Sequence, residues 1–297
     1  MSTLIEARDV HFSYGKVHAL RGIDLSIQSG EVVAILGPNG AGKTTFIETL
    51  MGSIRPDLGE VKVFGKYPVN FSARDWTQIG LVQQHWKDHQ KWRVEEHLKW
   101  IQYAHESCGT ETLDPFELLK QQGLADKWKA KLSALSGGQR RRVDLVAAMI
   151  SKPNLILLDE PTTGLDPEAK ATIHDIVSES ADSGATIVLT THDLHEAEKL
   201  ASRILIIKDG ALIADASVPD LRDQLVRPAQ IVWKQDGRRF VHATYEVEQY
   251  VKTLDLDGIS GLTITRPTLE DAYLALVNGN KKEKTAEETV DAKAGVL

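Results

Sequence analysis

The sequence predicts an α/β fold built around a mainly parallel sheet. Three short apolar runs carry this prediction, EVVAILG at 31–37, NLILLDEP at 154–161 and GATIVLTTHD at 184–193, and helical stretches alternate with the later runs. Continuous apolar runs of this length are typical of strands buried on both faces, and strands that alternate with helices form parallel sheets. A glycine-rich segment follows the first run, as in a phosphate-binding loop.

Strands are also predicted on both sides of the first buried run. In GIDLSIQSG, Ile23, Leu25 and Ile27 alternate with polar residues, as in a strand with one buried face. GEVKVFG at 59–65 is another short strand between glycines. From about residue 86 to 150, apolar residues recur at helical spacing, as in EEHLKWIQYA, and predict a helical subdomain.

The core, residues 1–220, is expected to end with a hairpin. SRILIIKDGALIADA holds two apolar runs around Asp209-Gly210, a residue pair suited to a tight turn. Residues 221–280 then read strand, strand, helix, strand, helix, which predicts a small α+β accessory domain. Residues 281–297 are polar and charged, and we expect a disordered tail.

Composition favours a soluble protein of the cytoplasm. Of 297 residues, 42% are hydrophobic and 26% are charged, which allows a sizeable core. The formal net charge of −7 gives no overall attraction to nucleic acid, so no nucleic-acid partner is expected. Cys108 is the only cysteine, which excludes an internal disulfide. No apolar run approaches the ~18 to 20 residues of a membrane span, so we expect membrane contact to be indirect.

The segment GPNGAGKT at 37–44 matches a phosphate-binding loop in its expected context, between a strand and a helix. Its glycines let the backbone curl with N–H groups inward, and the helix N-terminus adds positive potential. We expect Lys43 to reach the β and γ phosphates of a nucleotide and the hydroxyl of Thr44 to bind Mg²⁺. A glycine-rich turn with an exposed lysine is the disfavoured alternative. The expected nucleotide-binding residues here are Gly37, Pro38, Asn39, Gly40, Ala41, Gly42, Lys43, Thr44 and Thr45.

Two carboxylates, Asp159 and Glu160, end the run LILLDE, at the strand edge where open α/β sheets bind ligands. Asp159 suits the magnesium shell. Glu160 suits the orientation or deprotonation of an attacking water. Alone, these acids would be interpreted as solvated loop residues, but the phosphate loop upstream reverses that preference.

The segment LSGGQ at 135–139 is the most specific feature. Ser136 and Gln139 have capping-box spacing, and RRRVDLVAAMI continues as a helix. An ordinary helix cap is the alternative. Gly137 and Gly138 lower helix propensity, which is sensible where the backbone must approach an anion. Because the chain already has one phosphate loop, this second anion site most simply serves a nucleotide held by another copy.

With these motifs in order, the chain resembles the ATP-binding cassette (ABC) family, specifically the nucleotide-binding subunit of a transporter. GPNGAGKT is similar to the Walker A motif, LSGGQ to the signature, LILLDE to Walker B and TTH at 190–192 to the switch-histidine segment. The resemblance implies a P-loop NTPase (RecA-like) core with antiparallel β and helical subdomains. It also implies two cassettes that close head to tail around two ATP molecules, with Ser136, Gly137 and Gly138 touching the partner's γ phosphate.

The same resemblance assigns four further residues. Tyr14 in HFSYG would stack on adenine, although it could simply pack in a strand. Asp166 in TGLD would communicate between the two sites, and it is also a good N-cap. His192 would hydrogen-bond the γ phosphate, whereas the residue alone favours an ordinary loop histidine. The family spacing selects Gln84 over Gln83 as the glutamine that touches Mg²⁺.

The segment after Gln84 is richer in tryptophan than this region of the family usually is. Trp86 and Trp92 are interpreted equally well as core residues or interface anchors. His85 and His89 are spaced like helical metal ligands, but no third ligand is evident, so a solvated face is favoured over zinc.

RPTLEDAYLAL at 266–276 resembles the ending of cassettes from drug, polysaccharide and sodium exporters. The first hypothesis is therefore an ATPase, peripheral on the cytoplasmic face of the membrane, that hydrolyses ATP to ADP and phosphate. It would pair with a second cassette, with a homodimer favoured, and drive a separate integral membrane permease. A cassette ATPase acting on ribosome or nucleic acid is the alternative, although Arg140–Arg142 more plausibly flank the signature helix. A P-loop kinase would leave LSGGQ unexplained.

Overall fold

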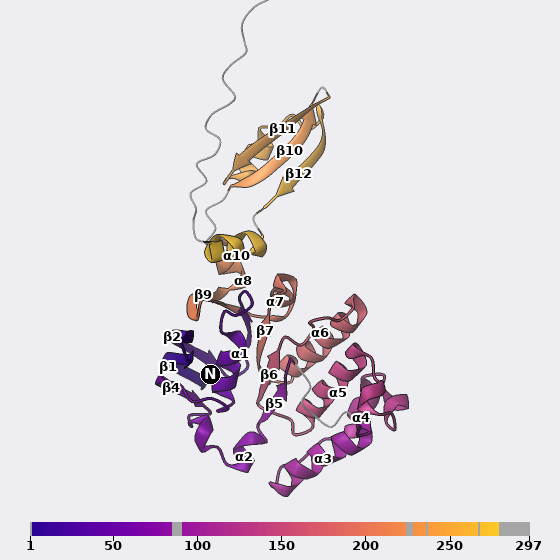
Figure 1. Cartoon of the computed structure of the whole chain (residues 1–297). Helices are drawn as coiled ribbons and strands as arrows, with labels where there is room; N and C mark the ends of the chain where they lie inside the picture. The colour runs from indigo at the N-terminus through magenta and orange to yellow at the C-terminus, as the bar shows by residue number, and fades with distance from the viewer. Residues whose placement is uncertain (1, 85–90, 224–227, 236, 267, 279–297) are drawn as a thin grey trace, which may run out of the picture. The chain divides into compact units, whose positions relative to one another are not determined.

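The computed structural model describes residues 2–84, 91–223, 228–235, 237–266 and 268–278 (Figure 1). The chain divides into two compact units, residues 1–220 and 221–297. Within the described residues, no helix combines the length and the apolar character that crossing a membrane would require.

A six-stranded sheet forms the centre of the first unit. Its strands, in spatial order, are β5 (Ile79–Val82), β6 (Leu155–Asp159), β7 (Thr186–Thr191), β3 (Val32–Leu36), β8 (Arg203–Lys208) and β9 (Ala211–Ser217). The first five are parallel and β9 is antiparallel. Every residue of β3, β6 and β7 is buried, as the apolar runs predict. The predicted α/β fold class is confirmed.

A three-stranded antiparallel sheet packs with this centre. It consists of β1 (Thr3–Tyr14), β2 (Val17–Gln28) and β4 (Leu58–Val63), in the order β2-β1-β4. One cluster of buried side chains joins both sheets to α1 (Lys43–Leu50), whose Phe46 is fully buried. The short α2 (Ala73–Trp76) precedes β5. The phosphate loop therefore stands on a continuous apolar core.

Three helices in the part of the chain between β5 and β6 form a second core. They are α3 (Val94–Ser107), α4 (Pro115–Gln121) and α5 (Gly137–Met149), and their buried cluster includes Leu98, Leu119 and Val143. Trp92 packs partly buried against this cluster, whereas Trp100 is exposed. His85, Trp86 and His89 lie outside the described residues.

Two helices flank the strands that follow. α6 (Pro167–Asp182) leads into β7, and α7 (Leu194–Leu200) connects β7 to β8. Each follows the carboxyl end of a central strand, α6 after β6 and α7 after β7, which is the sheet edge where ligands bind in open α/β sheets.

The second unit shows the predicted order of elements. It contains β10 (Ala229–Gln235), β11 (Arg238–Thr244), α9 (Val247–Lys252), β12 (Ile259–Thr265) and α10 (Leu269–Asn278), while α8 (Val218–Asp223) spans the boundary at residue 220. The strands form an antiparallel sheet in the order β11-β10-β12. Ile231, Trp233 and Val247 form its small core. The expected tail, 281–297, lies outside the described residues.

The predicted hairpin is confirmed, and its turn contacts the phosphate loop. Asp209 and Gly210, between β8 and β9, have φ values of 50° and 82°. The Gly210 N–H donates to the Ala41 carbonyl at 3.0 Å. A Cβ at Gly210 would lie 2.8 Å from the Ala19 carbonyl oxygen, so glycine meets both a conformational and a steric requirement there.

Gly210→Ala should therefore destabilise the protein more than the same change at a glycine of similar φ in open space. Gly123, with φ of 68° and no neighbour within 4 Å of the Cβ position, is the matched control. We expect Gly123→Ala to cost about 1 kcal/mol of unfolding free energy, because only backbone strain is added. Gly210→Ala should cost about 3 kcal/mol, because it adds the clash with Ala19. Equal losses in urea unfolding would contradict this account.

Candidate functional site

The loop between β3 and α1 can be built only with glycine at two positions. A Cβ at Gly37 would lie 2.2 Å from the Ile207 carbonyl oxygen. Gly42, the N-cap of α1, has φ of 109°, and its Cβ would lie 2.5 Å from the Ala19 carbonyl oxygen. The loop is thus pressed against the neighbouring backbone, and this fixes the N-terminus of α1.

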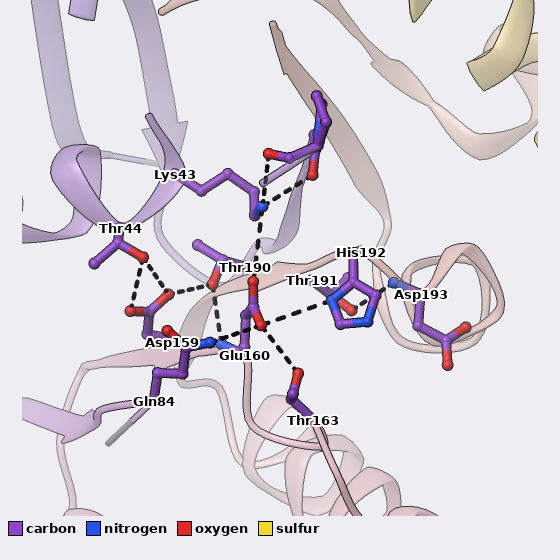
Figure 2. A network of polar contacts seen from close by, with 12 residues as sticks. Lys43, Thr44, Gln84, Asp159, Glu160, Thr163, Thr190, Thr191, His192 and Asp193 are labelled. Carbon is purple, nitrogen blue, oxygen red and sulfur yellow. Dashed lines mark hydrogen bonds and ion pairs between the residues drawn. The ribbon is translucent and has the colours of Figure 1, made fainter. Parts of the chain in front are cut away.

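Lys43 is buried within the curl of this loop. Its side chain is 5% exposed, and Nζ donates to the carbonyls of Gly37 at 2.9 Å and Pro38 at 3.3 Å (Figure 2). The Ala41 N–H donates to the Pro38 carbonyl at 3.1 Å, and this closes the turn. The predicted loop therefore curls around the Lys43 ammonium group and binds it through two backbone carbonyls.

The carboxyl end of β6 brings Asp159 to the same place. Thr44 Oγ1 donates to Asp159 Oδ2 at 3.1 Å, and Thr190 Oγ1 donates to Asp159 Oδ1 at 2.6 Å. The second bond follows from the sheet register, which pairs Asp159 with Thr190 across β6 and β7. Hydroxyl and carboxylate oxygens are ligands that Mg²⁺ prefers, so Thr44 and Asp159 fit the predicted metal.

Glu160 lies at the centre of the polar network in Figure 2. Its Oε2 accepts hydrogen bonds from Gln84 Nε2 and Thr163 Oγ1, both at 3.0 Å. Lys43 Nζ lies 3.7 Å from Oε1, and His192 Nδ1 lies 3.6 Å from Oε2. A carboxylate that is 9% exposed thus has four polar neighbours, which come from four different segments of the chain.

The backbone of Glu160 is held in an uncommon conformation. Its φ is 47°, in the left-handed region, and its N–H donates to the Thr190 carbonyl at 3.1 Å. Strain of this kind persists where the surrounding structure over-determines a residue, and it concentrates at functional sites. In this conformation the Glu160 side chain points toward Lys43 and His192 (Figure 2).

A cavity of about 560 Å³ opens over this network. The predicted residues among its lining are Tyr14, Asn39, Gly40, Gly42, Lys43, Thr44, Thr45, Gln84, Glu160 and His192, and the others are Val17, Ala19 and Thr163. Its volume lies in the range of small-molecule sites. Tyr14 is half exposed, and its hydroxyl donates to Glu48 Oε2 at 2.8 Å. Burial and this bond to Glu48 raise the pKa of Tyr14.

Of the two adjacent glutamines, Gln84 lines the cavity and Gln83 is exposed. Arg141 of α5 holds the backbone of both glutamines through its guanidinium group. Its Nη1 donates to the Gln83 carbonyl at 2.6 Å and its Nη2 to the Gln84 carbonyl at 3.2 Å. Burial lowers the pKa of this guanidinium. The cavity is thereby joined to the helix that begins at the signature-like segment.

Nine predicted residues are not among the described residues that line the cavity. Four of them, Gly37, Pro38, Ala41 and Asp159, belong to the phosphate loop or bond to it, and the other five are Ser136, Gly137, Gly138, Gln139 and Asp166. The capping box is confirmed, since the Gln139 N–H donates to Ser136 Oγ and the Ser136 N–H to Gln139 Oε1. Asp166 caps α6, with Oδ1 accepting from the Ala169 N–H at 2.8 Å. Both segments therefore begin helices outside the cavity of their own chain.

Sequence reasoning missed three polar residues of the network. Thr190 bonds Asp159, Thr163 bonds Glu160, and Arg141 holds the backbone at Gln84. Thr190 had a signal, because it lies next to the end of a buried strand, two residues before His192. Thr163 and Arg141 had none, since the Thr163 contact depends on the turn that follows Glu160 and the Arg141 contact on how distant segments pack.

A family model described as ABC transporter matches residues 20–163. A model described as AAA domain, putative AbiEii toxin, Type IV TA system, matches the shorter stretch 129–198. A daunorubicin resistance ATP-binding protein of Streptomyces coeruleorubidus is 34% identical, over 92% of this chain and 95% of that protein. A Nod factor export ATP-binding protein I of Burkholderia orbicola is 37% identical, over 92% and 96% of the two chains.

Solved structures give the same result. A structure described as the ATP-binding subunit of an ABC transporter superposes with a TM-score of 0.67 at 28% identity, covering 75% of this chain and 93% of that one. The dimeric, post-hydrolysis state of an ATP-binding cassette bound to ADP and Pi superposes with a TM-score of 0.64 at 25% identity, covering 72% and 98%. Fold, loop and relatives agree: the chain belongs to the ABC transporter family as one of its ATP-binding subunits, with the cassette fold of an ATPase.

Proposed function

We propose that the cavity binds MgATP and that Lys43, Thr44 and Asp159 hold its phosphates and metal. In support, the Lys43 ammonium is buried at the helix N-terminus where loop N–H groups favour anions. Thr44 and Asp159 supply hard oxygen ligands from two adjacent elements, and Gln84 lies close enough to join them. The metal, when bound, neutralises charge on the phosphates. Tyr14 at the rim of the cavity stacks on the adenine.

Hydrolysis is assigned to Glu160 and His192. The observation that carries this assignment is the buried Glu160 carboxylate, held between Gln84, Thr163, Lys43 and His192. A fixed carboxylate beside the phosphate loop can orient a water in line with the γ phosphate and accept its proton. His192, with its half-exposed ring, is free to donate a hydrogen bond to the γ phosphate. Catalysis is therefore mainly positioning and charge stabilisation.

The segment Ser136–Gln139 is assigned to the nucleotide of a second cassette. Its capping box begins a helix whose first turn has two glycines, which suits close approach to an anion. The segment is nevertheless not among the described residues that line the cavity of its own chain. In a pair of cassettes, this N-terminus would lie over the γ phosphate bound by the other copy, and Asp166 would lie near the interface between the two copies. A head-to-tail homodimer completes both sites.

The cassette drives a separate integral membrane permease from the cytoplasmic face, in the direction of export. The support is twofold: the ending RPTLEDAYLAL, and the names of the relatives, which are drug resistance and Nod factor export ATP-binding proteins. No observation favours a ribosome or nucleic-acid partner.

Glu160→Gln should retain ATP binding and lose nearly all turnover, because the amide keeps the shape of the side chain but cannot accept the proton. We expect kcat to fall at least about 100-fold, while the dissociation constant for ATP changes little. Phosphate release and ATP binding are measured on the same preparation. Glu179→Gln, an exposed glutamate on α6, is the matched control. Parent-like phosphate release by Glu160→Gln would refute the role of Glu160.

Thr44→Ala should raise the Mg²⁺ concentration needed for half-maximal ATPase activity on the order of tenfold, because one oxygen ligand is lost. Thr44→Ser keeps the hydroxyl and should behave like the parent. Chelation with EDTA should abolish hydrolysis in all three proteins. An unchanged Mg²⁺ titration for Thr44→Ala would remove Thr44 from the metal site.

A further inference from the structure

Two polar contacts join α6 to α7, the helices that begin just after Asp166 and His192. Lys170 Nζ lies 3.0 Å from Asp193 Oδ2, and His174 Nε2 lies 3.3 Å from Glu196 Oε1. Lys170 and His174 are four residues apart and share one face of α6. Asp193 is the N-cap of α7, and Glu196 is in its first turn. The contacts therefore hold the first turn of α7 against the first half of α6.

The two oxygens of Asp193 have separate partners. Oδ1 caps α7, accepting from the N–H groups of His195 at 3.1 Å and Glu196 at 3.3 Å, whereas Oδ2 accepts from Lys170. The Asp193 N–H donates to Thr191 Oγ1 at 2.9 Å. Asp193 is thus fixed in three directions, and in Figure 2 its carboxylate points away from Glu160.

These bonds bracket His192 on both sides. Thr191 is the last residue of β7, Asp193 is the N-cap of α7, and His192 is the single residue between them. Because the His192 ring is 55% exposed, its own packing does little to orient it. Apart from its contact with Glu160, the ring is therefore oriented by the backbone on either side, and Lys170 is the only group of α6 in an ion pair with Asp193 within the described residues.

We propose that Lys170 is a positioning residue for His192, acting through the Oδ2 atom of Asp193. The inference rests on the proposed function, in which His192 contacts the γ phosphate. Lys170 touches no reacting atom itself. It stands one helical turn after Asp166, and its N–H donates to the Asp166 carbonyl at 3.0 Å. One turn of α6 and one ion pair therefore connect the residue expected at the joint between cassettes with the residue expected at the γ phosphate.

The ion pair has a geometric role and contributes little stability. Both side chains are about one-third exposed, and pairs in such positions contribute little to unfolding free energy. Burial acts to raise the pKa of Asp193, but hydrogen bonds from Lys170 and from backbone N–H groups outweigh it and lower that pKa. The His174–Glu196 contact is the more buried one, with side chains 12% and 1% exposed, and it keeps α7 on α6 when Lys170 is changed.

The test uses two substitutions that break the pair from opposite sides. Lys170→Met keeps the aliphatic length and removes the charge. Asp193→Asn keeps an oxygen to cap α7 and turns its amide N–H groups toward Lys170. Each should lower kcat for ATP hydrolysis about tenfold, as expected when a catalytic group is displaced without being removed. KM for ATP and the melting temperature should stay close to the parent values. Lys170→Arg keeps the positive charge and should have the kcat of the parent. Lys199→Met, at an exposed lysine of α7, is the control and should also leave kcat unchanged.

The double variant separates a shared role from two independent ones. If both residues act through one ion pair, Lys170→Met with Asp193→Asn loses no more than either single variant. Losses that multiply to about 100-fold would overturn the proposal, as would parent-like kcat in both single variants. His192→Ala is measured alongside. If it retains turnover, the proposed function of His192 fails; if it loses turnover while the pair variants do not, only the positioning role fails.

Discussion

The site depends on one constraint, the adjacency of β6, β7 and β3 in a parallel sheet. The carboxyl ends of the three strands meet at one edge, so the phosphate loop, the Asp159–Glu160 pair and the Thr190–His192 segment must meet there as well. The register of the three strands pairs Asp159 with Thr190 and Leu36 with Thr191, so the ends of the strands are aligned. The chemistry of the site is thereby set by the packing of residues that take no part in it.

The adjacency of these strands also brings three buried charged side chains together, and each of them has hydrogen-bond partners. Lys43 is bonded to loop carbonyls, Asp159 to two hydroxyls, and Glu160 to an amide and a hydroxyl. Buried charges persist only when paired and hydrogen-bonded in this way. Groups held in place in this way are the main source of catalysis when phosphoryl groups are transferred.

Local patterns predicted the parts of the fold and site that are themselves local. The phosphate loop, the capping box at Ser136, the hairpin at Gly210 and the strand ending in Asp159 are each written within a dozen residues. Contacts between distant segments were not predictable in the same way. Arg141 meets the Gln84 carbonyl from α5, and Lys170 meets Asp193 only because α6 and α7 pack side by side. Periodicity predicts strands but not their order, so it could not place Thr190 beside Asp159.

The central claim is that this ATPase drives a separate membrane protein. The most direct measurement is to purify tagged Glu160→Gln chain from gently solubilised membranes in the presence of ATP, which should trap the closed pair of cassettes, and to identify what copurifies by mass spectrometry. We predict a stoichiometric membrane protein with several spans, together with two copies of this chain. Recovery of soluble dimer, ribosome or nucleic acid alone, with no membrane protein in the preparation, would contradict the account.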